Sequence, residues 1–329
     1  MVMKDFIKAF PDHIEDAIKM AESIRLKTTL SDINNIVISG QGGSAIGGVI
    51  VKNLLRNSLN VPIIINKNYT IPSFVNENTL FIASSYSGNT EETLSALQQA
   101  ESRRSHVFLI TSGGELLDIA QNKSYNHIVI PKGGAPRAML CYSVVQLLFV
   151  LNMLQGNSTQ VLTQDLLNIK KHLVFYQNDI IKEAINIVDK ISNKMPFIYA
   201  CDEFEGVALR FKQQLNENSK RHACYNLIPE MNHNEIVPWV KKNMCVIPIF
   251  INGISLDKNR KRVDININQI LKSVDEVVDV TLANNNYLIQ YFHFIHLLDW
   301  VSLFLAEKGG VDPDDITLID VLKEQLNNT

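Results

Sequence analysis

Residues 40–48 read GQGGSAIGG, and residues 84–94 read SSYSGNTEETL. Each segment follows a short apolar run, 36–38 before the first and 80–83 before the second, and each leads into a stretch with helical character. A strand, a loop rich in glycine and hydroxyl groups, and a helix in that order present backbone N–H groups and a helix N-terminus to an anion. Two such loops in one chain predict a phosphate group that is held from two sides.

Apolar strands and helical stretches alternate through the first half of the chain. The expected strands are residues 36–39, 61–65, 79–84, 106–111 and 127–130, and the expected helices are residues 44–56, 90–102, 115–121 and 137–154. This alternation predicts a doubly wound, flavodoxin-like α/β domain with a parallel sheet. In the strand order 2-1-3-4-5, ligands bind beyond the carboxyl ends of strands 1 and 3, where the strand order reverses. These two strands end in the two quoted loops.

The polar segment 155–160 is the predicted domain boundary, which gives one domain at 1–155 and a second at 156–329. We expect helical stretches at 5–27, interrupted at Pro11, and at 163–192. The second domain then repeats the α/β pattern, with strands at 197–200, 222–225, 244–250 and 277–280 and helices at 205–216, 259–272, 286–308 and 317–326. It has no comparable glycine and hydroxyl loops, so we interpret it as a degenerate copy that has lost phosphate binding.

Composition limits the function classes. The chain has 329 residues, 46% of them hydrophobic, and a formal net charge of −3, which gives no electrostatic attraction to nucleic acid or to an anionic membrane. The start of the chain lacks the apolar run of a signal peptide, and the apolar stretch 144–154 is too short to cross a bilayer. The scattered cysteines indicate reduced thiols and a cytoplasmic protein: Cys141, Cys201, Cys224 and Cys245.

Hydroxyl groups and one arginine are the candidate ligands of an anion in the first domain. Ser44, Ser85, Ser87 and Thr90 stand at strand ends and helix starts, although such residues also serve simply as helix caps and turn residues. Arg137 follows the sequence GGAP, and its permanent charge suits an oxyanion, although it could equally be a surface or capping arginine.

The two loops resemble those of the sugar isomerase (SIS) domain. With GGAPR at 133–137, QLNEN at 214–218 and PEMNHNE at 229–235, the chain resembles the bifunctional phosphoglucose/phosphomannose isomerases. The resemblance implies two tandem SIS domains and an enzyme that interconverts glucose 6-phosphate and mannose 6-phosphate with fructose 6-phosphate through a cis-enediol. It also implies a homodimer whose active site is completed across the interface, a hexose 6-phosphate substrate, and no cofactor or metal.

The same resemblance assigns roles to individual residues. Glu217 would move the proton between C2 and C1, Arg137 would stabilise the intermediate, and His233, reaching in from the partner subunit, would open the sugar ring. The residues that would contact the substrate, chiefly its phosphate, are Gly43, Ser44, Ser85, Ser87 and Thr90, with Lys323 approaching it from the C-terminal helix. A role for Thr317 in accepting mannose is left unassigned, because its spacing from Lys323 does not fit.

The residues alone leave alternatives to these roles. Glu217 is expected at a helix C-terminus, where the helix dipole favours uptake of a proton, but most glutamates are simply solvated. His233 could be a structural histidine, or a metal ligand with Glu230 and Glu235. We interpret a further set on one helical face as polar groups of a buried apolar helix: His293, His296 and Asp299.

Two other functions stay open. The chain could be an isomerase of another phosphosugar, such as a pentose or heptose phosphate, although those enzymes usually have one SIS domain. It could also be a sugar-phosphate-binding regulator, although the N-terminal helical stretch is too short for a helix-turn-helix and the chain is not basic.

Overall fold

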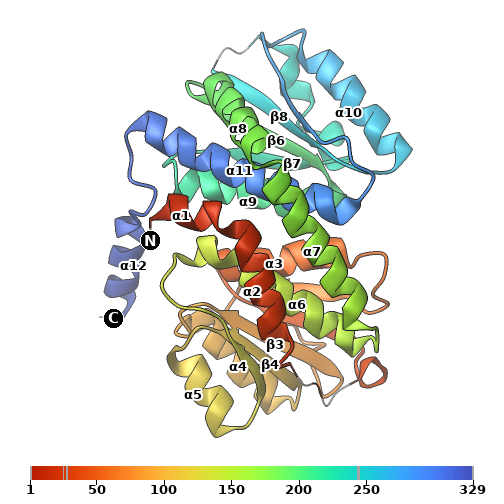
Figure 1. The fold of residues 1–329 in the computed structure, drawn as a ribbon, viewed down its shortest axis with the longest axis vertical. Coiled ribbons are helices and arrows are strands. Elements are labelled where there is room, and N and C mark those ends of the chain that lie inside the picture. Colours follow the sequence, from red (N-terminus) through yellow and green to blue (C-terminus); the bar gives the residue numbers. More distant parts are fainter. Residues whose placement is uncertain (1, 25, 27–28, 243–244, 328–329) are drawn as a thin grey trace. The chain divides into compact units, whose positions relative to one another are not determined.

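A computed structural model describes residues 2–24, 26, 29–242 and 245–327, and it divides into two compact units (Figure 1). The first unit comprises Lys8–Tyr176 and Glu203–Gly206, and the second comprises Val2–Ile7, Gln177–Asp202 and the described residues from Val207 onward. Residue 244, the predicted first residue of a strand, and residues 25 and 27 of the N-terminal helical stretch lie outside the described residues.

The first unit contains a five-stranded parallel sheet in the order β2-β1-β3-β4-β5, which confirms the predicted order. Ile38 of β1 pairs with Ile65 of β2 on one side and with Ile82 of β3 on the other. The strand order therefore reverses between β1 and β3, as expected. The strands are β1 (Asn35–Ser39), β2 (Ile63–Asn66), β3 (Thr79–Ser85), β4 (His106–Thr111) and β5 (Asn126–Val129).

Helices cover both faces of this sheet because its strands are apolar on both sides. On one face, Val37, Phe81 and Leu109 pack in a core cluster with residues of α4 and α5. On the other, a Cβ on Gly48 of α3 would lie 3.0 Å from Ile38 Cγ2, so α3 approaches the sheet closely. The helical elements are η1 (Leu30–Asp32), α3 (Gly42–Leu54), α4 (Glu91–Ser102), α5 (Gly114–Asn122), η2 (Pro136–Met139) and α6 (Leu140–Leu154).

Two further helical stretches differ from the expected pattern. The N-terminal helical stretch divides into α1 (Met3–Lys8) and α2 (Phe10–Ala21), because Pro11 fits in the first turn of a helix but not in its interior. The first compact unit also extends past residue 155 to include α7 (Thr159–Phe175), which packs against α2. Lys170 of α7 forms an ion pair with Asp12 of α2 at 2.9 Å.

The second unit repeats the topology with a parallel sheet in the order β7-β6-β8-β9. Its strands are β6 (Met195–Cys201), β7 (Cys224–Ile228), β8 (Val246–Asn252) and β9 (Val278–Thr281). Its main helices are α8 (Gln177–Ile191), α9 (Glu205–Glu217), α10 (Asp257–Ile270), α11 (Tyr287–Gly309) and α12 (Thr317–Asn327). Short 3-10 turns occur at η3 (Asp202–Phe204), η4 (Glu230–His233) and η5 (Val237–Val240).

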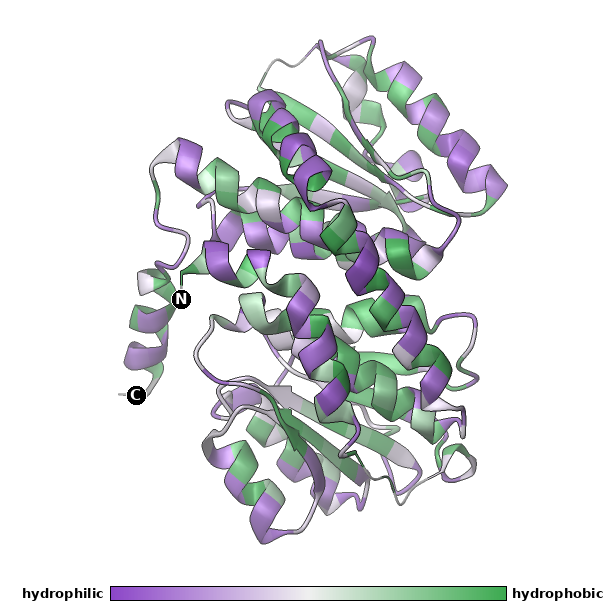
Figure 2. Ribbon diagram, in the orientation of Figure 1, coloured by the Kyte–Doolittle hydropathy of each residue, from purple (hydrophilic) through white to green (hydrophobic). Residues whose placement is uncertain are grey.

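Among the residues that the structure describes, two helical segments are long and apolar enough to cross a membrane, namely Pro136–Leu154 and Tyr287–Gly309. However, 89% of the apolar window of the first and 83% of that of the second are buried inside the protein. Figure 2 shows the strands coloured toward the hydrophobic end of the scale, in contrast to the mostly hydrophilic α10. Packing in a protein core therefore accounts for the composition of both segments.

Candidate active site

The two glycine and hydroxyl loops lie side by side at the carboxyl ends of β1 and β3. The hydroxyl of Ser44, in the first turn of α3, accepts a hydrogen bond from the backbone N–H of Tyr86 at 3.3 Å. A Cβ on Gly40 would lie only 2.7 Å from the carbonyl oxygen of Ser84, so a side chain at this position would separate the two strand ends. The structure thus brings together the two segments that the sequence predicts as an anion site.

Hydroxyl groups order the second loop from within. The Ser85 and Thr90 hydroxyl oxygens are 2.9 Å apart, and Ser85 Oγ accepts the backbone N–H of Gly88 at 3.1 Å. Ser87 Oγ accepts the N–H of Asn89 at 3.2 Å. Ser85 and Ser87 therefore do serve as turn residues, whereas Thr90, the N-cap residue of α4, directs its hydroxyl to Ser85 and makes no capping bond. The loop is a defined structure with its hydroxyls held at fixed positions.

Backbone contacts fix this loop against the N-terminus of α5. Gly88 has a φ of 75°, in the left-handed region that favours glycine, and a Cβ there would overlap the carbonyl oxygen of Gly113. The Gly88 carbonyl accepts the N–H of Leu116 at 3.0 Å, and Asn89 Oδ1 accepts the N–H of Glu115 at 2.9 Å. The shape of the loop is therefore dictated by neighbouring backbone.

Arg137 lies beside the first loop rather than on the surface. Arg137 is part of η2, and only 3% of the residue is exposed, so the interpretation as a surface arginine is excluded. A Cβ on Gly43 would lie 3.1 Å from the backbone nitrogen of Arg137, so the N-terminus of α3 and η2 are in contact. Tyr86 Oη accepts the N–H of Gly134 at 3.2 Å, which joins the same segment to the second loop. The three segments singled out in the first domain thus form one cluster.

Glu217 is the last residue of α9, as the amphipathic pattern predicts, and it is a half-buried residue that lines a cavity of about 530 Å³ in the second unit. Lys220 closes the end of the helix, because its Nζ donates to the carbonyl oxygens of Glu217 and Asp312, each at 2.7 Å. The cavity is lined by Asn216, Glu217, Lys220, Arg221, His222, Asp315, Ile316, Thr317, Leu318 and Ile319. Glu217 therefore borders a space large enough for a small ligand.

Of the two C-terminal candidates, only Thr317 is among the residues that line this cavity. Its hydroxyl donates to Asp315 Oδ1 at 2.6 Å, at the start of α12. Lys323 is exposed further along the same helix. Lys323 thus lies on the expected C-terminal helix, but it is not among the residues that line the cavity beside Glu217.

His233 ends η4 and is exposed to solvent on a segment that is held by polar contacts. The two oxygens of Glu235 accept hydrogen bonds from Tyr199 Oη at 2.8 Å and from Asn226 Nδ2 at 2.6 Å, and Glu230 Oε1 accepts from Asn234 at 2.8 Å. Among the residues that the structure describes, no three His, Cys, Asp or Glu side chains converge as metal ligands. The carboxylates near His233 organise its segment.

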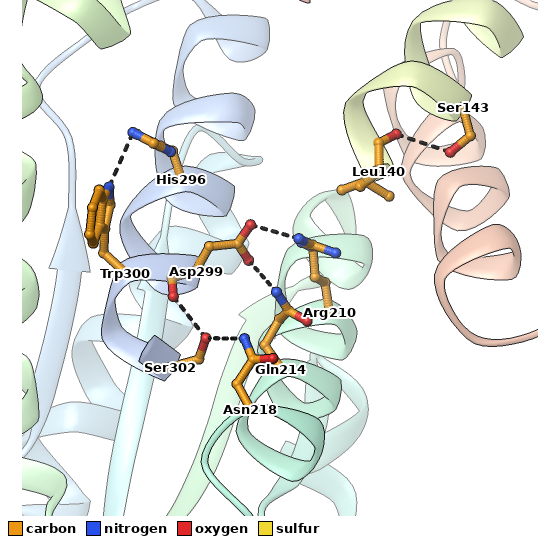
Figure 3. Close-up of polar contacts among 9 residues, drawn as sticks. All are labelled: Leu140, Ser143, Arg210, Gln214, Asn218, His296, Asp299, Trp300 and Ser302. Atoms are coloured by element: carbon orange, nitrogen blue, oxygen red, sulfur yellow. Dashed lines mark hydrogen bonds and ion pairs between the residues drawn. The ribbon is translucent and has the colours of Figure 1, made fainter. Parts of the chain in front are cut away.

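The polar residues of α11 are buried within the second unit, in agreement with the prediction. Burial, together with the nearby His293, lowers the pKa of His296 to about 3, and His296 Nε2 accepts a hydrogen bond from Trp300 Nε1 at 3.3 Å. Asp299 forms an ion pair with Arg210 of α9 at 2.6 Å (Figure 3). Burial raises the pKa of Asp299, while Arg210 and Gln214 act in the opposite direction. Arg210 was not predicted, and Gln214 entered only as part of the QLNEN segment, although their four-residue spacing on an amphipathic helix was a visible signal.

Comparison with known proteins gives three results. The SIS domain family model matches residues 29–155, and that of the bacterial phospho-glucose isomerase C-terminal SIS domain matches residues 180–326. A bifunctional phosphoglucose/phosphomannose isomerase of Caldicellulosiruptor bescii is 36% identical over 336 residues, covering 98% of each chain. A D-glucosamine-6-phosphate 4-epimerase of Sulfolobus acidocaldarius is 34% identical over 68% of this chain and 70% of its own. The C-terminal domain of glucosamine-fructose-6-phosphate aminotransferase from Francisella tularensis shares the fold, with a TM-score of 0.76 at 17% identity over 95% of this chain and 98% of that one.

Proposed function

This chain belongs to the bifunctional phosphoglucose/phosphomannose isomerase family and carries two SIS domains, and on that premise we propose that it interconverts glucose 6-phosphate and mannose 6-phosphate with fructose 6-phosphate. The observation that carries the proposal is the cluster at the carboxyl ends of β1 and β3. There, fixed hydroxyls and a helix N-terminus form an environment suited to a phosphate monoester.

The first part of the proposed mechanism is an anchor. Ser44, Ser85, Ser87 and Thr90 would hold the phosphate through hydroxyl and backbone N–H groups, with Gly43 giving close access to the α3 N-terminus. Arg137 would stabilise negative charge on the enediolate oxygen, because a guanidinium stays charged even when it is buried. The mutual contacts of these three segments support a common role.

The second part is proton transfer. Glu217 would remove the C2 proton of the aldose and deliver it to C1, so that the carbonyl moves from C1 to C2 through a cis-enediol. His233, from the partner subunit of a homodimer, would open the ring by passing a proton to the ring oxygen, and Lys323 would approach the substrate from α12. No step in this scheme needs a cofactor or metal. We place the enzyme in the cytoplasm, in keeping with its free cysteines, among them the buried Cys141 and Cys201.

A coupled assay tests the proposal directly. We expect purified protein to convert both glucose 6-phosphate and mannose 6-phosphate to fructose 6-phosphate, because both aldoses give the same cis-enediol. Glucosamine 6-phosphate is assayed in parallel for 4-epimerisation, since a relative is named for that activity. Turnover of glucosamine 6-phosphate with neither hexose phosphate converted would replace this proposal by the epimerase, and binding without any turnover would favour a regulator.

His233 is expected to act before the proton transfer at carbon. Replacement by alanine should lower kcat/KM for cyclic glucose 6-phosphate by about 10²-fold, the lower range for loss of a general acid–base group. The kcat/KM of the same variant for an aldose phosphate that cannot form a ring should fall far less. His172, a half-buried histidine of α7 that is not among the residues lining the cavity, provides the control substitution His172→Ala. Equal losses on cyclic and open-chain substrates would show that His233 does not open the ring.

A further inference from the structure

Buried polar side chains connect α9 to α11 in the second unit. This α9–α11 network consists of Arg210 and Gln214 of α9, Asn218 and Ser219 in the turn that directly follows it, and Asp299 and Ser302 of α11. All of these residues except Ser219 are drawn in Figure 3. Arg210 Nη2 donates to Asp299 Oδ2 at 2.6 Å, and Gln214 Nε2 donates to Asp299 Oδ1 at 3.0 Å. One carboxylate on α11 thus receives donors from two successive turns of α9.

The network continues to the residues that directly follow Glu217. Asn218 Nδ2 donates to Ser302 Oγ at 2.9 Å, and Ser302 Oγ donates to the carbonyl oxygen of Asp299 at 2.7 Å. Ser219 Oγ donates to the carbonyl oxygen of Ser302 at 2.6 Å. The backbone on the carboxyl side of Glu217 is therefore attached to α11 by two adjacent side chains.

Stability alone does not account for a charged pair in this place. The side chains of Arg210 and Asp299 are only 4% and 6% exposed, so the loss of hydration offsets much of their attraction. The neighbouring positions of α11, such as Trp300 and Val301, are buried and apolar. Apolar residues at the paired positions could stabilise the two helices at least as well. The directional hydrogen bonds of the polar pair additionally fix the rotation of α9 about its own axis and its register along α11.

That rotation determines where Glu217 points. Arg210 and Gln214 are four residues apart and therefore lie on one face of α9, and Asn218 continues this spacing just beyond the last residue of the helix. Glu217 follows Arg210 by seven residues and Gln214 by three, so it lies near the same face at the end of the helix. It is also one of the residues that line the cavity. We propose that Arg210, Gln214, Asp299 and Ser302 are positioning residues, which fix the Glu217 carboxylate at the cavity. The inference rests on the proposed role of Glu217 as the base.

The test compares an apolar triple variant, Arg210→Met with Gln214→Leu and Asp299→Leu, with the parent enzyme. We expect its thermal midpoint to be unchanged or higher, since buried ion pairs replaced by apolar residues behave in this way. Its kcat should fall about 10- to 100-fold with little change in KM, because a small displacement of a catalytic group has effects of this size. A role confined to stability would leave kcat of the folded variant unchanged.

A label-transfer experiment reports on geometry independently of the fraction of active enzyme. With glucose 6-phosphate deuterated at C2, Glu217 takes the deuteron and returns either it or a proton exchanged from solvent to C1 of fructose 6-phosphate. A displaced carboxylate returns the label more slowly, so the fraction of deuterium retained at C1 should fall in the triple variant. Unchanged retention together with unchanged kcat would overturn the inference.

Ser302→Ala provides a second variant that keeps the ion pair, and it decides the question if the triple variant does not fold. It should show the same loss of kcat and label retention, whereas Ser143→Ala should not. Ser143 is the matched control, because its hydroxyl also donates within a buried helix to the carbonyl three residues before it, that of Leu140, at 3.0 Å (Figure 3).

Full activity in Glu217→Gln would refute the role of Glu217 as the base, whereas an inactive Glu217→Gln with an unaffected Ser302→Ala would refute only the positioning role.

Discussion

Substitution of Glu217 by glutamine is expected to lower kcat by about 10³-fold, within the range for removal of a general base. Glutamine has nearly the same size and keeps hydrogen-bonding atoms, but it cannot take the proton from C2. Since the hydroxyl loops lie elsewhere in the sequence and are untouched, the affinity for phosphosugar should stay within about threefold of the parent. Turnover is measured by the coupled assay, and affinity by calorimetry with the inactive variant.

Glu205 offers the matched control for this substitution. It is a half-buried glutamate at the opposite end of α9, in the first turn rather than the last. Glu205→Gln should retain kcat within about twofold, because its carboxylate does not line the cavity. If Glu217→Gln keeps more than about a tenth of the parent kcat, the base must be sought at another residue.

Replacement of Arg137 by methionine is expected to lower kcat by about 10² to 10³-fold, the effect of removing one preorganised donor from an oxyanion. Methionine fills a similar volume at this buried position but has no charge or donor. The lost stabilisation should be specific to the negatively charged intermediate. Affinity for a stable, planar, anionic analogue of the enediolate should therefore fall in parallel with kcat, while affinity for substrate changes much less.

Arg103 is a suitable control for the arginine substitution, because its Nη1 donates to the carbonyl oxygen of Pro72 at 2.7 Å in the same unit. Arg103→Met should leave affinity for the analogue unchanged. An analogue that binds Arg137→Met as tightly as the parent enzyme would show that the guanidinium has only a structural function.

Much of the fold could be predicted because it depends on local pattern. Strand β4 was predicted with its observed bounds, and β1 and β3 to within one residue, since continuous apolar runs between turn residues define buried strands. The strand order followed from the general behaviour of such sheets rather than from any single residue. The SIS domains were indicated by the resemblance of the two loops in the first domain, together with GGAPR, QLNEN and PEMNHNE, to segments of a known family.

Contacts between distant segments were less accessible to prediction. The polar segment after residue 155 indicated a boundary, but packing of α7 on α2 extends the first compact unit to Tyr176. Asp299 was interpreted as a polar group of a buried helix, yet its partner Arg210 lies 89 residues away in sequence. The pairing of two helices depends on tertiary packing. The sequence therefore showed two polar residues at 210 and 214 on one helical face without showing which helix they contact.

The close approach of Gly88 to Gly113 fixes the shape of the second loop before any ligand binds. A loop whose shape is set by its own protein neighbours loses little conformational entropy when it captures an anion. In the proposed mechanism, the free energy released when this loop binds the phosphoryl group would be available for holding the sugar carbons in the orientation of the transition state. Binding of the phosphate would then contribute to the rate of the reaction. A hexose without a phosphate group should therefore show a lower kcat as well as a lower affinity.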